Sequence, residues 1–127
     1  MHQVGLTPLL AALSGFLCVA VGAFGAHLVT DPHGRELIEI GVRYNILHTM
    51  AALASVSFRN WGAAVARFAA PLFFIGIVLF SGSLYVRGAG MAMAGMTAMA
   101  PPVGGLFFLA GWCVLIWAGV TLAVKPR

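Results

Sequence analysis

Four long apolar runs follow one another along the chain, separated by short stretches that hold most of its charged and turn-forming residues. Each run is about 20 residues long, the length that a helix needs to cross the roughly 30 Å hydrocarbon core of a bilayer. The pattern therefore predicts an all-α membrane protein in which residues 1–127 form a single domain, an antiparallel bundle of four transmembrane helices. The predicted helices cover residues 7–29, 35–58, 68–86 and 103–124.

The first run carries small residues at every fourth position, which places them on one face of a helix. Small side chains in a membrane helix let a neighbouring backbone approach closely. We expect this stripe to pack against another helix, and we assign the same role to two glycines of the fourth run. The predicted packing residues are Ser14, Cys18, Gly22, Gly25, Ala26, Gly104 and Gly105.

The second run differs from the others because it has two polar faces when it is read at about 100° per residue. Glu36, Glu39 and Arg43 lie on one face near its start, at the level expected for lipid headgroups. Tyr44 and His48 lie on the other face and continue toward the middle of the helix. Burying polar side chains in a membrane is costly, so such residues are candidates for function.

A polar cluster is predicted around Tyr44 and His48, because an imidazole in hydrocarbon needs hydrogen-bond partners. We expect both side chains to face the bundle interior and to meet a polar group of the first or third run. The candidate cluster is His27, Tyr44, His48, Ser81 and Tyr85. Such a group could relay protons, hold a lipid headgroup or bind a quinone carbonyl. It could equally be a hydrogen-bond clasp that fixes the register of the helices.

The composition supports a bilayer protein, since 61% of the residues are hydrophobic and 8% are charged, against about a quarter charged in soluble domains. The net charge is +4, but the cations are scattered at helix ends and form no clustered patch for nucleic acid. Arg59, Arg67, Lys125 and Arg127 fall on the side of both termini. Arg35, Arg43 and Arg87 fall on the other side with all three acidic residues. This bias predicts cytoplasmic termini.

Metal and catalytic chemistry have little support in the sequence. Cys18 and Cys113 lie in apolar runs without metal-binding spacing and are read as buried, reduced residues. The loop before the fourth run contains Met91, Met93, Met96 and Met99, whose thioethers suit Cu(I). Flexible apolar filler is the alternative interpretation of these methionines. We favour the filler, predict no cofactor, and lean against an enzyme.

Four motifs appear in order along the chain: GAFGAH at 22–27, Tyr44-xxx-His48, LFSGSLY at 79–85 and PVGGLFFLAGW at 102–112. Together they resemble the domain of unknown function 423 family, small bacterial inner-membrane proteins similar to vertebrate transmembrane protein 256. The resemblance implies a helical inner-membrane protein of this size, with no established reaction or ligand. The positions that match its motifs are Gly22, Gly25, His27, Tyr44, His48, Ser81, Tyr85, Gly104, Gly105 and Trp112.

The favoured interpretation is a structural or accessory protein of the inner membrane, because nearly all of the chain is needed to build the bundle. Its expected partners are membrane lipid and either further copies of itself or a larger membrane complex. The first alternative is a lipid or quinone site at the outward ends of the first three helices. The second alternative is Cu(I) binding by the methionine loop.

Overall fold

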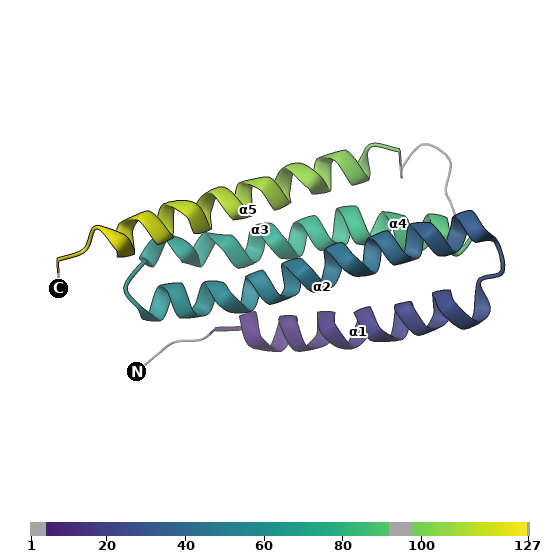
Figure 1. Cartoon of the computed structure of the whole chain (residues 1–127), viewed down its shortest axis with the longest axis horizontal. Coiled ribbons are helices and arrows are strands. Elements are labelled where there is room, and N and C mark those ends of the chain that lie inside the picture. Colours follow the sequence, from purple (N-terminus) through teal and green to yellow (C-terminus); the bar gives the residue numbers. More distant parts are fainter. Residues whose placement is uncertain (1–4, 92–97, 127) are drawn as a thin grey trace.

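The computed structural model describes residues 5–91 and 98–126, and every regular element in them is helical. The elements lie side by side as long rods (Figure 1). The rod that contains α3 and α4 is continuous from Ala64 to Gly88, although its backbone changes type along the way. The elements are α1 (Thr7–Leu28), α2 (Pro32–Asn60), the 3₁₀ turn η1 (Ala64–Phe68), α3 (Ala69–Gly76), the π-helical turn η2 (Ile77–Ser81), α4 (Gly82–Gly88) and α5 (Ala100–Ala123).

The helix boundaries differ from the predicted ones where prolines were interpreted as turn residues. Helix α2 begins at Pro32, three residues earlier than predicted, because Asp31 caps it and its carboxylate accepts the backbone N–H of Gly34 at 2.9 Å. Helix α5 begins at Ala100, before Pro101 and Pro102. A proline in the first turn of a helix loses no hydrogen bond, since that N–H has no partner within the helix.

Within the described residues, three helical stretches are long and apolar enough to cross a membrane: Thr7–Leu28, Ala64–Gly88 and Ala100–Ala123. Helix α2 is not one of them. It carries charged residues in its first three turns, and polar residues such as Asn45, His48 and Thr49 further along. Three of the four predicted spans thus agree with the structure, while a membrane crossing by α2 stays a prediction.

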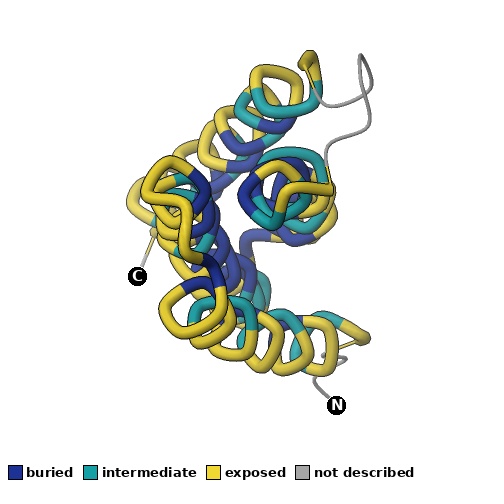
Figure 2. The backbone as a smooth tube through the Cα atoms, turned by 90° about the vertical axis from the view of Figure 1, so that its right-hand side faces the viewer, coloured by how far each residue is buried: buried dark blue, intermediate teal, exposed yellow. Residues whose placement is uncertain are grey.

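Helix α2 occupies the centre of the molecule, in contact with α1, with the α3/α4 rod and with α5. Helix α1 packs almost entirely on α2, whereas α5 packs mainly on α3 and η2. The two outer helices therefore lie at opposite edges (Figure 1). Seen from the end, the buried residues face the middle of the molecule and exposed residues cover its outside (Figure 2). This arrangement leaves α1 and α3 without direct packing along most of their length.

Alanine and glycine dominate the core where α2, α3 and α5 meet, so large side chains of one helix fit against small residues of the next. Phe73 is fully buried against Gly111, where an added Cβ would lie 2.6 Å from the phenyl ring. At the end where α2 begins, the backbones of Gly34 and Gly88 touch, and a Cβ on either would lie 2.6 Å from the other's carbonyl oxygen. Close backbone approach through small residues is typical of packed membrane helices.

Candidate functional site

A hydrogen-bond network around Asn45 joins α1, α2 and α4. Ser14 of α1 donates to Asn45 Oδ1 at 2.8 Å and also lies 2.8 Å from the hydroxyl of Thr49. Thr49 donates to the same Asn45 oxygen at 3.1 Å. Asn45 Nδ2 donates to the phenolic oxygen of Tyr85 at 3.0 Å. Asn45 is only 3% exposed, so its amide sits at the point where three helices meet.

This network leaves one amide hydrogen of Asn45 without an acceptor in the described part of the chain. Asn45 Nδ2 carries two hydrogens and gives one of them to Tyr85. The Tyr85 hydroxyl accepts that bond, and its own proton lies within reach of the Cys18 thiol and the Ser81 hydroxyl. Asn45 and Tyr85 also line the same groove. A bound molecule that brings an acceptor oxygen can take the remaining Asn45 hydrogen and compete with Cys18, a weak acceptor, for the Tyr85 proton.

The groove runs between α1 and the α3/α4 rod, where these two elements do not pack against each other. Its volume is about 520 Å³, within the range of about 300–1,000 Å³ common for ligand pockets. No charged residue lines it among the described positions, and most of its wall is aliphatic or aromatic. The lining residues are Leu10, Leu13, Ser14, Leu17, Val21, Asn45, Phe74, Ile77, Val78, Gly82 and Tyr85.

Tyr85 is held at the groove by two local features of the neighbouring helices. Its ring lies against Gly41 of α2, where an added Cβ would come within 2.7 Å of the ring. The π-helical turn Ile77–Ser81 precedes it, and Ser81 donates to the carbonyl of Gly41 at 2.7 Å. A π turn widens the helix and changes the direction of the residues after it, and such turns are frequent at functional sites.

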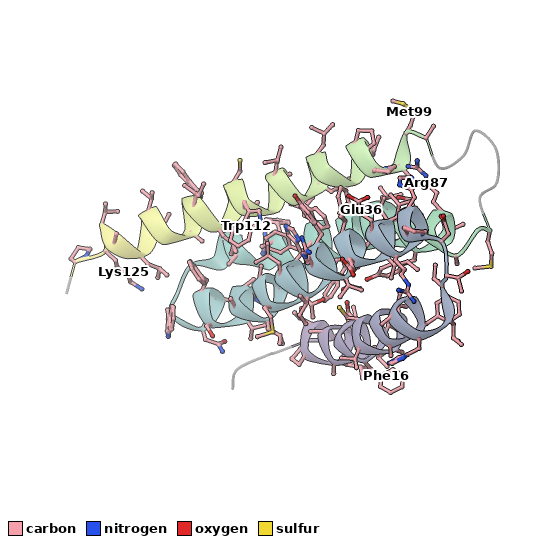
Figure 3. All side chains as sticks on the ribbon, turned by 45° about the vertical axis from the view of Figure 1, so that its right-hand side comes forward. Phe16, Glu36, Arg87, Met99, Trp112 and Lys125 are labelled. Atoms are coloured by element: carbon pink, nitrogen blue, oxygen red, sulfur yellow. The ribbon has the colours of Figure 1, made fainter. Side chains whose placement is uncertain are left out.

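His48 lies on a neighbouring face of α2, toward α5, and belongs to a separate group of aromatic residues. Trp112 of α5 donates its indole N–H to His48 Nε2 at 3.1 Å, and His48 Nδ1 lies 2.6 Å from the carbonyl of Tyr44 (Figure 3 labels Trp112 on α5). An indole N–H can only donate and a carbonyl can only accept. The imidazole is therefore neutral, with its proton on Nδ1. Its ring stacks on Phe108, with 3.6 Å between centroids.

A second recess of about 490 Å³ lies beside this aromatic group, between α2 and α5. Tyr44 lines it and is 43% exposed, with its ring packed against Phe80 at 4.6 Å between centroids. Both ring nitrogens of His48 are already engaged, so the imidazole has no free nitrogen to offer a ligand or a metal. The hydrogen bond from Trp112 to His48 links α5 to α2.

The five residues of the predicted cluster are divided over different faces of the molecule. Ser81 and Tyr85 lie on the side of α2 that faces α1 and α4, whereas Tyr44 and His48 lie toward α5. His27 is exposed near the end of α1, outside both groups. The expected burial of His48 agrees with its 3% exposure. Its polar partner, however, comes from α5 and not from the first or third run, so that part of the expectation is wrong.

Asn45, Thr49 and Trp112 complete the two groups and were not selected by sequence reasoning as site residues. A signal was present for the first two. Asn45 and Thr49 are four residues apart and follow Gly41 by the same spacing, so they form a third, smaller polar face of α2. Trp112 was singled out only as a position that matches the family motifs, since its place in an apolar run equally suits contact with lipid.

The predicted packing residues occupy several environments. Cys18 and Gly25 are buried against α2, with Cys18 Sγ 3.4 Å from the Val42 carbonyl, and Gly22 lies beside Val42. Ser14 joins the Asn45 network, and Ala26 is exposed. Gly104 packs tightly on Phe80, whereas a Cβ at Gly105 would meet nothing within 4 Å.

The structure describes only part of the methionine loop. Met93 and Met96 lie outside the described residues, while Met91 and Met99 are exposed at its two ends. Across the described ranges 5–91 and 98–126, no group of three or more His, Cys, Asp or Glu side chains could hold a metal ion. Both cysteines are free thiols, and Cys18 is buried as expected. Cys113 is exposed, so the expected burial of Cys113 is wrong.

Comparison with known proteins identifies relatives along nearly the whole chain. The model of a family described as "Protein of unknown function (DUF423)" matches residues 21–105. A "UPF0382 membrane protein" of Haemophilus influenzae is 38% identical over 85% of this chain and 88% of its own length. The "UPF0382 inner membrane protein YgdD" of Escherichia coli K12 is 37% identical over 91% and 89%. The Bacillus subtilis "UPF0382 membrane protein YwdK" is 31% identical over 88% and 94%. No solved structure matches the chain.

Proposed function

Because the chain belongs to the DUF423 family of small membrane proteins, we propose that it works within the bilayer as a binding protein for an uncharged amphiphile. The ligand would have an apolar tail and a carbonyl oxygen near one end. The observation that carries this proposal is the unpaired amide hydrogen of Asn45 beside the Tyr85 hydroxyl, because both residues line the groove between α1 and the α3/α4 rod.

The proposal requires that α2 also crosses the membrane. Its central exposed residues are apolar, including Ile46, Leu47 and Met50, while its central polar residues are buried. That distribution is the reverse of a soluble helix and suits a lipid environment. The stretch between Arg43 and Arg59 spans about 24 Å at roughly 1.5 Å per residue. Long arginine side chains can reach the interface from just inside it.

The chemistry of the groove selects a class of ligand. Its wall is apolar, so it favours an acyl or isoprenoid chain over a soluble metabolite. A phosphate or ammonium group would be buried without an opposite charge at this position, which is costly in a medium of low dielectric constant. A carbonyl oxygen accepts hydrogen bonds without carrying charge, and it matches the two donors. Isoprenoid quinones and acylglycerol esters share this chemistry.

The test measures ligand affinity for the protein in lipid nanodiscs, with a long-chain quinone and a diacylglycerol as separate probes. Tyr85→Phe removes the phenolic donor with almost no change of volume, so we expect affinity for one probe to fall about threefold to tenfold, the effect of losing one neutral hydrogen bond. Tyr44→Phe is the matched control, because Tyr44 lines the separate recess beside α5 and not this groove, and it should bind as the unaltered protein does. Equal affinity of the unaltered protein and Tyr85→Phe would contradict the proposal.

A second candidate is the structural or accessory role, in which the same groove receives a helix of a further copy or of a larger membrane complex. The position of α1 favours it, because α1 packs almost entirely on α2 and large apolar side chains such as Phe16 point away from the molecule (Figure 3). Native mass spectrometry from a mild detergent distinguishes the two. A bound small molecule on a monomer supports the first candidate, and a ligand-free oligomer supports the second.

A further inference from the structure

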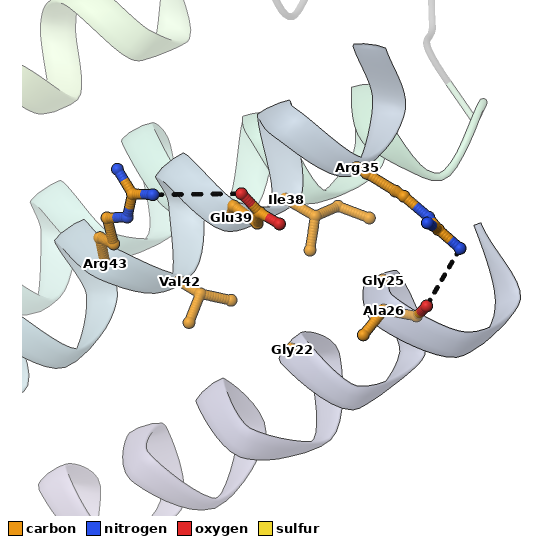
Figure 4. A pocket seen from close by; sticks show the side chains of 8 residues that line it. All are labelled: Gly22, Gly25, Ala26, Arg35, Ile38, Glu39, Val42 and Arg43. Carbon is orange, nitrogen blue, oxygen red and sulfur yellow. Dashed lines mark hydrogen bonds and ion pairs between the residues drawn. The ribbon is translucent and has the colours of Figure 1, made fainter. Parts of the chain in front are cut away.

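A charged recess lies between the last turns of α1 and the first three turns of α2 (Figure 4). Its volume is about 220 Å³. Small residues of α1 form one wall, and α2 supplies charged side chains around two aliphatic ones. The lining residues are Gly22, Gly25, Ala26, Arg35, Ile38, Glu39, Val42 and Arg43.

Arg35 is fixed at one end of this recess by the end of α1. Its Nη2 donates to the carbonyl of Ala26 at 3.1 Å, and its Nε donates to the carbonyl of Val29. These carbonyls belong to the final turn of α1 and the residue after it, where helical carbonyls lack partners within the helix. A guanidinium has five N–H donors, so Arg35 is held in position and still has donors to offer an anion.

Glu39 and Arg43 provide one charge of each sign at the other end. Arg43 Nη2 lies 4.0 Å from Glu39 Oε2, and the Arg43 and Glu39 side chains are 76% and 69% exposed, respectively. An ion pair at this distance and this exposure contributes little to the stability of the protein. A charged group of a ligand can therefore replace Arg43 as the partner of Glu39, or replace Glu39 as the partner of Arg43. Among the α2 residues that line the recess, the charges are positive, negative and positive in order, over about 12 Å at 1.5 Å per residue.

When the apolar middle of the molecule lies in the hydrocarbon core of the bilayer, the recess lies at the level of the lipid headgroups. Glu36 of α2 and Arg87 of α4 mark the same end of the molecule, opposite Lys125 (Figure 3). Ile38 and Val42 line the recess below the charged groups, so an attached acyl chain would find an apolar surface. This combination fits a phospholipid better than a free anion, which would gain nothing from the aliphatic wall.

We propose that this recess binds the headgroup of a zwitterionic phospholipid whose cation is a primary ammonium, as in phosphatidylethanolamine. The phosphodiester lies between Arg35 and Arg43, since guanidinium groups bind phosphate oxygens in bidentate fashion. The ammonium donates to the carboxylate of Glu39. A quaternary ammonium has no N–H and cannot make that bond, while an anionic headgroup has no cation to offer it.

Native mass spectrometry of the purified protein tests this by competition among phosphatidylethanolamine, phosphatidylcholine and phosphatidylglycerol. We expect the unaltered protein to retain phosphatidylethanolamine preferentially. Glu39→Gln should reduce that preference about twofold to fivefold, the range that a single exposed ion pair contributes, without weakening phosphatidylglycerol. Arg43→Gln should weaken both of these lipids. Arg87→Gln, at the same end of the molecule but outside the recess, is the matched control and should change neither.

All three substitutions are at exposed positions, and thermal unfolding of each variant will show that the fold is retained. Inorganic phosphate at millimolar concentration should not displace the lipid, and displacement would mean that the recess is a simple anion site. Equal retention of the three lipids by the unaltered protein would overturn the proposal. So would unchanged selectivity in Glu39→Gln. Tyr85→Phe should leave this selectivity intact, so the outcome is independent of the amphiphile groove.

Discussion

At the scale of single residues, Asn45 is the side chain on which most of the polar contacts in α2 depend. Its carbonyl oxygen accepts from Ser14 and Thr49, and its amide nitrogen donates to Tyr85. The carbonyl oxygen of an asparagine side chain can accept two hydrogen bonds and its NH₂ group can donate two. Such a side chain can connect hydroxyl groups from three helices. The same amide keeps one hydrogen for a ligand, so a single residue serves both the packing and the groove.

Asn45→Ala should therefore destabilise the protein through several contacts at once. We expect a loss of about 2 kcal/mol, since each interhelical hydrogen bond in a membrane contributes roughly 0.6 kcal/mol and a cavity adds to it. Unfolding by denaturant in detergent micelles measures this. Thr121→Ala is a suitable control, because Thr121 bonds only to the Ala118 carbonyl of its own helix among the described residues. Equal stability of the two variants would show that the network contributes nothing.

At the scale of elements, periodicity predicted the helices well and their relative positions poorly. Long apolar runs identify helices because each helix needs a continuous stretch to cross hydrocarbon. They do not say which helices touch, and the predicted cluster on α2 separated into two groups because α5, not α1, covers His48. The π turn Ile77–Ser81 was equally invisible. Its residues are as apolar as those before it, and only the packing around Ser81 and Gly41 reveals it.

The contact between α1 and α2 gives a prediction at this scale. Gly25→Ala should weaken the packing of α1, because its Cβ would lie 2.6 Å from Cγ2 of Ile38, and the two helices must separate to accept it. Gly15→Ala is the control on the same helix, since a Cβ there meets nothing within 4 Å. It should be neutral or stabilising by up to about 1 kcal/mol, through helix propensity. Thermal unfolding in detergent compares them, and a greater loss at Gly15 would contradict the described interface.

At the scale of the whole molecule, α2 is the least apolar helix and also the most enclosed. Its polar residues find partners on α1, α4 and α5, so the protein hides its polarity inside and presents apolar surface outside. The opposite ends differ in charge. Among the described residues, the end with Arg59, Arg67 and Lys125 carries only positive side chains, whereas the other end mixes three arginines with Asp31, Glu36 and Glu39.

Four crossings would put both termini on the same side, and the positive end would face the cytoplasm. Reporter fusions after Arg127 and in the loop between α4 and α5 test this directly. We expect cytoplasmic activity from the C-terminal fusion and periplasmic activity from the loop fusion. If α2 does not cross, the three remaining crossings place the two termini on opposite sides, and a fusion at each terminus would then report different compartments.

The central claim is that the groove between α1 and the α3/α4 rod holds an uncharged amphiphile through Asn45 and Tyr85. An experimental structure of the protein in lipid nanodiscs, prepared with a long-chain quinone or a diacylglycerol, tests it most directly. The account predicts elongated density along Leu13, Leu17 and Val78, with a polar end within about 3 Å of Asn45 Nδ2 and the Tyr85 hydroxyl. A groove closed by α1, or filled by a helix of a second copy, would contradict it.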